Sequence, residues 1–276
     1  MLVKFRLTLV VVFSSLLGYL IAAGTSFSWL DMVILMVGGF LVTSAANALN
    51  QVLEREYDIL MTRTADRPVT AGRMKTSEAV LFAGLSCLAG VTLLSLFNGM
   101  TAFLGLLSLV IYAFVYTPMK RYSSLAVAVG AIPGALPVLI GTTAVESSIT
   151  YLGILLFSVQ FFWQFPHFWS IGYNSFEDYQ RAGYKLIPTS YGKPDRRIGK
   201  FSMMYALAVL PVIGLLYYFG YTGLFATLVL MFWSILYVVF SALFDFSFNK
   251  ASALKLMFFS FLYLPVFLLV VWIFNF

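Results

Sequence analysis

Three residues with oxygen-bearing side chains, Asn50, Glu54 and Asp58, recur at intervals of four beside a long apolar segment. On a helix, this spacing turns each side chain only about 40° from the last and raises it by about 6 Å. The three oxygens are therefore predicted to share one helix face. Such ligands suit Mg²⁺, which takes one or two carboxylates and completes its shell with water and substrate phosphate. The single histidine of the chain argues against a zinc site built on two histidines.

Basic residues follow this acidic face. Arg63 and Arg67 lie beyond Asp58 at another four-residue spacing. Guanidinium groups bind phosphate oxygens in bidentate fashion, so acids that hold a metal beside bases that hold phosphate would bind a diphosphate group. An ordinary interfacial loop with helical ion pairs is the alternative interpretation. Glu56, which lies off the acidic face, fits that alternative.

A second polar segment begins at Trp163 and His167 and continues through Asn174 to Asp178. If one helix runs through it, His167, Asn174 and Asp178 share a face. Two interpretations of His167 stay open. It is either a hydrogen-bonded residue of an interfacial aromatic belt, or a ligand or proton-transfer group.

Further basic residues lie near both polar segments. Lys120 and Arg121 follow Tyr116 on a short loop between the segments, and Arg181 and Lys185 come after the second one. These bases either contact phosphate or only set the topology of the chain in a membrane. Both interpretations stay open from spacing alone.

The composition is that of a membrane protein. Hydrophobic residues make up 61% of the 276 and charged residues only 10%. Hydropathy predicts an all-α fold with nine spans, each near the roughly 20 residues that cross the hydrocarbon core. The predicted spans are 5–24, 31–54, 78–97, 101–117, 125–144, 149–172, 201–221, 223–244 and 255–275. The first is expected to be an uncleaved helix, because it is long enough to span and more spans follow it.

The basic residues support this arrangement. With the N-terminus in the cytoplasm and the C-terminus outside, all 17 Lys and Arg residues fall on the inner side, as the positive-inside rule predicts. The polar segments then lie at the cytoplasmic face. The net charge of +6 is explained by this membrane face and needs no nucleic-acid partner. The span at 125–144 is rich in glycine and proline, which predicts close helix packing or a cavity wall.

Three blocks of sequence together resemble the UbiA superfamily of intramembrane prenyltransferases, and within it the branch that farnesylates haem b. The blocks are Asn50-x-x-x-Glu54-x-x-x-Asp58-x-x-Met61-x-Arg63-Thr64-x-x-Arg67-Pro68; Tyr116-Thr117-x-x-Lys120-Arg121; and Trp163-Gln164-x-Pro166-His167-Phe168 with Asp178-Tyr179-x-x-Ala182-Gly183. Their order and spacing agree with the superfamily across essentially the whole chain.

The resemblance implies a single transmembrane prenyltransferase domain over residues 1–276, with nine helices around a central cavity. It implies transfer of farnesyl from farnesyl diphosphate to the 2-vinyl group of haem b, with Mg²⁺, giving haem O and diphosphate. The implied metal ligands are Asn50, Glu54, Asp58 and Asp178. The implied residues of catalysis and binding also include Arg63, Arg67, Lys120, His167, Trp163, Tyr116, Arg121, Asn174, Arg181 and Lys185. The expected setting is the lipid bilayer of a bacterial cytoplasmic membrane, with a haem-delivery protein or haem A synthase as candidate partner.

Departures from the superfamily pattern bear on the acceptor. His167 and Asn174 stand where other branches have aspartates, which leaves a second metal open and allows His167 to meet haem through the iron or a propionate. Glu54 stands where many relatives have Asp, and Thr142 follows Gly141 where the family commonly has Trp. A quinone-type aromatic acceptor is the rival among prenyltransferases. A transporter of an anionic metabolite is the rival outside them, but it predicts polar residues near the bilayer midplane.

Overall fold

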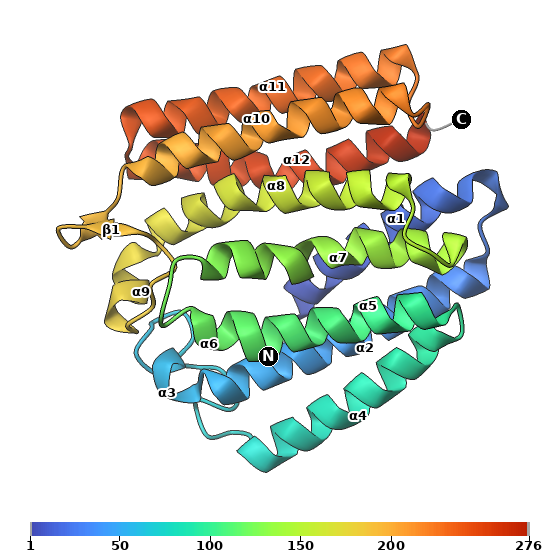
Figure 1. Ribbon diagram of the computed structural model, residues 1–276. Coiled ribbons are helices and arrows are strands. Elements are labelled where there is room, and N and C mark those ends of the chain that lie inside the picture. The colour runs from blue at the N-terminus through green and yellow to red at the C-terminus, as the bar shows by residue number, and fades with distance from the viewer. Residues whose placement is uncertain (1, 275–276) are drawn as a thin grey trace. The chain divides into compact units, whose positions relative to one another are not determined.

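The computed structural model describes residues 2–274, in which the regular secondary structure is helical apart from one short hairpin, so the predicted all-α class is confirmed. The chain divides into two compact units. The first comprises Met1–Ile149 and Glu177–Leu186, and the second comprises Thr150–Phe176 and Ile187–Phe276. Figure 1 labels the elements of both units along the chain.

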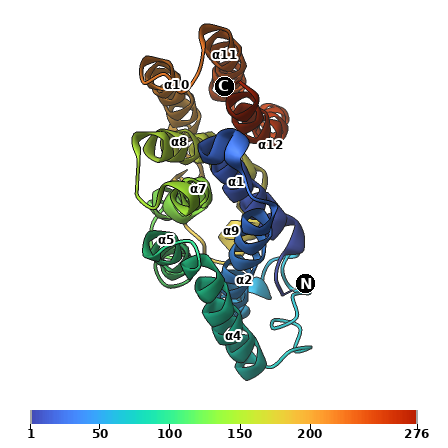
Figure 2. The ribbon, with the colours of Figure 1, turned by 90° about the vertical axis from the view of Figure 1, so that its right-hand side faces the viewer.

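The first unit contains α1 to α7 and most of α9. The bounds are α1 Phe5–Ala23, α2 Trp29–Leu53, α3 Arg55–Asp58, α4 Thr76–Ser95, α5 Gly99–Val110, α6 Thr117–Met119, α7 Ala126–Glu146 and α9 Phe176–Arg181, with a 3₁₀ turn at Gly24–Ser26 and a π-helical turn at Ile111–Tyr116. Within this unit α2 packs along α4, and α1 packs along α7 (Figure 2).

The contact between α1 and α7 is made by backbone against backbone. A Cβ atom on Gly141 would lie 2.0 Å from the carbonyl oxygen of Ser15, and one on Gly18 would lie 2.3 Å from that of Val138. Small residues allow such an approach between helices in lipid, where packing replaces the hydrophobic effect as the driving force. The close packing predicted for the span at 125–144 is therefore confirmed.

The second unit contains the remaining helices and the hairpin. The bounds are α8 Tyr151–Asn174, β1 Thr189–Ser190, β2 Lys193–Pro194, α10 Arg197–Tyr218, α11 Leu224–Ser247 and α12 Lys250–Ile273. The side chain of Thr150 accepts a hydrogen bond from the backbone of Gly153 and so caps α8, and Asn249 caps α12 through the backbone N–H of Ser252. Helix α8 contacts both α10 and α12.

Among the described residues, eight helices are long and apolar enough to cross a membrane. They are Phe5–Ser26, Trp29–Leu53, Thr76–Ser95, Gly99–Met119, Ala126–Glu146, Arg197–Tyr218, Leu224–Ser247 and Lys250–Ile273. A multi-pass membrane protein is thus confirmed, whereas the predicted count of nine is not. The remaining predicted span, 149–172, falls on α8, which has 24 residues but is not among these eight helices. The polar side chains of Gln160, Gln164 and His167 interrupt its apolar run.

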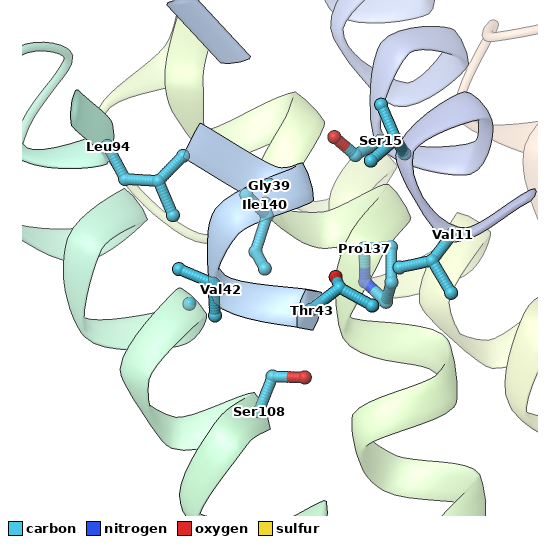
Figure 3. Close-up of a pocket in the computed structure, with 11 residues that line it drawn as sticks. Val11, Ser15, Gly39, Val42, Thr43, Leu94, Ser108, Pro137 and Ile140 are labelled. Carbon is cyan, nitrogen blue, oxygen red and sulfur yellow. The ribbon is translucent and has the colours of Figure 1, made fainter. Parts of the chain in front are cut away.

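The first unit contains a small, partly open cavity of about 30 Å³, lined mainly by aliphatic side chains such as Val11, Val42 and Ile140 (Figure 3). Ser15 also lines it, and its hydroxyl oxygen is buried without a hydrogen-bond partner among the described residues. The volume suffices for about one water molecule and is far too small for a prenyl chain. This cavity is therefore not a substrate site.

Candidate active site

The predicted acidic face is present where α2 passes into α3. Glu54 separates the two helices, but the helical hydrogen-bond pattern continues through it. The N–H of Glu54 donates to the carbonyl of Asn50 at 3.0 Å, and the N–H of Asp58 donates to the carbonyl of Glu54 at 2.8 Å. The side chains of Asn50, Glu54 and Asp58 are all buried, at 0%, 3% and 0% exposure. Buried carboxylates require partners, because an unpaired charge away from water is costly.

Cations from two other segments supply those partners. Lys120 donates to Glu54 with Nζ 2.6 Å from Oε1. Arg67 places Nη1 2.5 Å from Oδ2 of Asp58 and 3.7 Å from Oε2 of Glu54. Two of the bases predicted to bind phosphate, Arg67 and Lys120, thus contact the predicted metal ligands, and each of the two carboxylates is contacted by at least one cation.

Burial and pairing affect the two carboxylates differently. Burial raises the pKa of Asp58 above its ordinary value, and the guanidinium of Arg67 offsets only part of this increase. Burial acts in the same direction on Glu54, but the nearby ammonium of Lys120 outweighs it and holds the pKa of Glu54 below its ordinary value. One oxygen of Asp58, Oδ1, is buried without a hydrogen-bond partner among the described residues. A cation at that oxygen would favour the charged carboxylate.

The other predicted bases of the first unit differ in their surroundings. Lys120 also lies over the ring of Tyr116, 4.6 Å from its centroid. Arg121 turns toward Tyr57, donating to its hydroxyl at 2.7 Å and stacking 4.1 Å from its ring centroid. Arg63 is exposed on the loop after α3. The structure therefore brings Lys120 and Arg67 to the acids, whereas Arg121 contacts Tyr57 and Arg63 is exposed.

The end of the second polar segment docks beside this site. Asp178 pairs with Arg181, which also donates to Thr62 at 3.4 Å. The backbone N–H of Lys185 donates to the carbonyl of Lys120 at 2.7 Å. A small apolar cluster of Met61, Ala182 and Tyr184, with Tyr57 and Tyr179 against it, joins the same two segments. Segment Glu177–Leu186 thus covers the loop that carries the first motif.

The continuous helix that a shared face of His167, Asn174 and Asp178 would require is not present. Helix α8 ends at Asn174, Ser175 leaves helical geometry, and α9 starts at Phe176. The side chain of Asn174 forms its hydrogen bond within α8, because its Nδ2 donates to the Ser170 carbonyl at 2.8 Å. The second motif is accordingly divided, with its histidine in one compact unit and Asp178 in the other.

His167 lies in a tightly packed environment in the second unit. Its ring stacks on Trp163 with centroids 4.6 Å apart, and its Nδ1 lies 2.7 Å from the hydroxyl of Ser260 on α12. Trp163 donates to the carbonyl of the same Ser260 at 2.9 Å. The two residues of the W-x-x-x-H segment are therefore anchored on one serine, which no motif in the sequence indicated.

Two residues of the acidic site also escaped sequence reasoning. Lys4 donates to Oδ1 of Asn50 at 2.9 Å, and Asn50 donates through Nδ2 to the hydroxyl of Thr117 at 3.0 Å. Lys4 was counted only as a charge that sets topology. Thr117 is part of a motif but carried no predicted role. Neither contact follows from spacing, because each joins residues more than 40 positions apart.

The donor set bears on which metal would fit. In residues 2–274, no group of three or more His, Cys, Asp and Glu side chains is arranged to hold a metal ion. The site offers the amide oxygen of Asn50 and the two buried carboxylates of Glu54 and Asp58, and the Asp58 carboxylate includes the unpartnered Oδ1. This set suits Mg²⁺ that draws further ligands from water and phosphate, because Mg²⁺ is usually held by one or two protein carboxylates.

Known proteins share this sequence pattern and fold. The model of the UbiA prenyltransferase family matches residues 11–262. A protein of Cytophaga hutchinsonii named protoheme IX farnesyltransferase is 42% identical over 266 residues, covering 96% of this chain and 93% of its own. A protein of the same name from Flavobacterium johnsoniae is 40% identical over 222 residues, covering 80% of this chain and 73% of its own.

Solved structures agree in fold. A structure of digeranylgeranylglyceryl phosphate synthase superposes with a TM-score of 0.82 at 19% identity, covering 99% of this chain and 96% of that one. A UbiA homologue from Archaeoglobus fulgidus, bound to DMAPP and Mg²⁺, gives a TM-score of 0.73 at 15% identity, covering 98% and 97%. At these identities the likeness concerns the fold, while the family match and the two relatives named above each cover 80% or more of the sequence. The chain belongs to the UbiA prenyltransferase family.

Proposed function

We propose that the protein transfers the farnesyl group of farnesyl diphosphate to the 2-vinyl group of haem b, forming haem O and diphosphate. The names of relatives at 40–42% identity support this acceptor and donor. The observation that carries the proposal is the buried cluster in which Arg67 and Lys120 surround Glu54 and Asp58. That cluster combines oxygen ligands for a metal with cations for a diphosphate.

On the donor side, Asn50, Glu54 and Asp58 would hold Mg²⁺, with Oδ1 of Asp58 the oxygen that has no other partner among the described residues. The bound metal would act as a Lewis acid on the diphosphate. Arg67 contacts both acids through Nη1, and a guanidinium has five N–H donors. Its other donors therefore suit phosphate oxygens, which gain charge as the leaving group departs. We propose four further residues for binding the prenyl donor: Asp178, Arg63, Arg181 and Lys185.

The bond changes balance without a redox partner. The bond between C1 of farnesyl and its diphosphate oxygen breaks, and the diphosphate leaves with the electron pair. The π electrons of the vinyl group form the new bond to C1, which leaves a positive charge on the vinyl carbon beside the porphyrin ring. Water adds at that carbon and loses a proton, giving a hydroxyethylfarnesyl side chain. Arg67 and Lys120 stabilise the charge that develops on the leaving group.

On the acceptor side, we infer the tautomer of His167 from its hydrogen bonds. The hydroxyl of Ser260 lies 2.6 Å from the carbonyl of Met257, so its single proton is donated there. Nδ1 of His167, 2.7 Å from the same oxygen, must then carry its own proton and donate it. Nε2 is left with a free lone pair. Histidines that bind metals usually donate their other ring N–H to such an acceptor, so His167 is proposed as a ligand of the haem iron rather than a donor to a propionate.

We further propose that both compact units act as one prenyltransferase domain in a bacterial cytoplasmic membrane, with the N-terminus in the cytoplasm and the C-terminus outside. The grouping of all 17 basic residues on one side in this arrangement supports it. Trp163, Tyr116, Arg121 and Asn174 are proposed to line the substrate sites. A haem-delivery protein or haem A synthase is the expected partner, because haem b and haem O are poorly soluble.

A reconstituted assay tests the function. Purified protein in lipid, given haem b, farnesyl diphosphate and Mg²⁺, should yield haem O by liquid chromatography. Asp58→Asn should abolish the product. Asp66→Asn is the matched control, because Asp66 is an exposed acid of the same loop that pairs only with Arg73 among the described residues. Prenylation of 4-hydroxybenzoate in place of haem b would support the quinone-type alternative, and no haem O from folded protein would contradict the proposal.

A further inference from the structure

The segment that precedes α1 is fastened to α2 by polar side chains. Gln51 donates through Nε2 to the carbonyl of Leu2 at 2.8 Å, and Asn47 donates through Nδ2 to that of Val3 at 3.3 Å. Thr8 also donates to the Val3 carbonyl, at 2.7 Å. A segment at a chain end is usually loose unless it is held in this way.

These contacts direct Lys4 into the acidic site. Lys4 has a φ of 45°, a left-handed conformation that is unfavourable for a residue other than glycine. Its carbonyl accepts from the N–H groups of Leu7 and Thr8 and so starts α1. Its ammonium donates to Oδ1 of Asn50 at 2.9 Å and lies 3.5 Å from the hydroxyl of Tyr112. The backbone is thus held in an unfavourable conformation that places a cation beside the first residue of the motif.

The charge of Lys4 has no contacting counter-charge. The other two cations of the site, Arg67 and Lys120, each lie within 4 Å of a carboxylate. Lys4 makes no ion pair with any described residue, and both of its partners, Asn50 and Tyr112, are neutral. Two carboxylates thus stand among three basic side chains, and Lys4 is the base without an ion pair among the described residues. An ammonium so placed suits an anion that enters the site.

We propose that Lys4 is a binding residue for the diphosphate of the prenyl donor. Its ammonium would contact a diphosphate oxygen when the donor is bound. Lys4 would then release the amide oxygen of Asn50, which would be available to hold the metal. Fastening of residues 2–4 to α2 by Asn47 and Gln51 fixes the position of this cation in advance. This inference rests on the proposed function, in which the acidic site binds a prenyl diphosphate.

The test compares Lys4→Met with Arg6→Met in the full-length protein. Arg6 is exposed on α1, two residues away, so both changes remove one basic residue from the same end of the chain and affect membrane topology equally. The probe is farnesyl thiolodiphosphate, which cannot easily ionise, titrated with Mg²⁺ by calorimetry in detergent. Lys4→Met should weaken binding by about 10-fold or more, because a hydrogen bond between charged groups is lost. Lys4→Arg should retain most of the affinity.

The outcomes separate the two proposals. If the unchanged protein binds the probe, and Lys4→Met binds it with the same affinity as Arg6→Met, the role of Lys4 is overturned. The donor site would then still stand. No binding by the unchanged protein would overturn the prenyl-donor assignment and the role of Lys4 with it. A thermal unfolding profile of Lys4→Met that matches that of Arg6→Met excludes misfolding as the cause. If Lys4→Met does not fold, folded Lys4→Gln is used in its place, and an affinity of Lys4→Gln equal to that of Arg6→Met decides against the proposal.

Discussion

Nζ of Lys120 lies 2.6 Å from Oε1 of Glu54, and both side chains are almost fully buried, although 66 positions separate them. This contact ties the loop after the π-helical turn to the end of α2. Breaking a buried ion pair by removal of one partner costs about 3–5 kcal/mol, because the other charge is left without compensation.

Lys120→Met and Glu54→Gln should therefore each lower the free energy of unfolding by about 3 kcal/mol or more, and the double variant should lose less than the sum of both. Unfolding by sodium dodecyl sulfate in mixed micelles measures this. Variants of the exposed pair Arg73 and Asp66 are the control and should change stability little. Additive losses at Lys120 and Glu54 would contradict a direct interaction.

The metal should bind weakly until the diphosphate is present. The described residues lack a cluster of three His, Cys, Asp or Glu ligands, so the protein alone offers Mg²⁺ too few oxygens. Electron paramagnetic resonance with Mn²⁺ should show little bound metal in the protein alone and a clear gain on adding inorganic diphosphate. Removal of Mg²⁺ by EDTA should abolish product formation, and added Mg²⁺ should restore it. Tight Mn²⁺ binding without diphosphate would indicate a complete protein site instead.

Sequence spacing predicted the acidic face well but not its partners. Asn50, Glu54 and Asp58 share a face because four-residue spacing follows from helical geometry alone. Their contacts with Lys4 and Lys120 depend on how distant helices pack, which no local pattern encodes. The role of Lys4 was missed because basic residues were interpreted as determinants of membrane topology. A basic residue can obey the positive-inside rule and also form part of a binding site.

The second motif was harder to predict for a different reason. The face shared by His167, Asn174 and Asp178 assumed an unbroken helix, but α8 ends at Asn174. Nothing in the local sequence marks this end strongly, because neither Gly nor Pro follows Asn174 directly. The contact of His167 with Ser260 depends on the packing of α12 against α8 and so required the structure.

The glycine contact between α1 and α7 predicts a contrast between two substitutions. Gly141→Ala places a methyl group against the backbone of Ser15 and should lower the free energy of unfolding by about 1–3 kcal/mol through overpacking. Gly214→Ala, in the interior of α10, meets nothing within 4 Å and should be neutral or stabilising by up to about 1 kcal/mol, because alanine favours the helix. Mixed-micelle unfolding measures both. Equal effects would argue against the tight contact.

The hydrogen bond between Ser260 and His167 predicts how haem binding responds to a distant hydroxyl. If Nε2 of His167 ligates the iron, His167→Ala should shift the Soret band of bound haem b, and added imidazole should restore it. Ser260→Ala removes the acceptor of the Nδ1 proton, so the ring loses its orientation and haem affinity should fall by about 10-fold or more. Ser241→Ala is the control, because this buried hydroxyl bonds only to the Tyr237 carbonyl among the described residues. An unchanged Soret band in His167→Ala would exclude iron ligation. The hydrogen bond from His167 to Ser260 would then only stabilise the packing of α8 against α12.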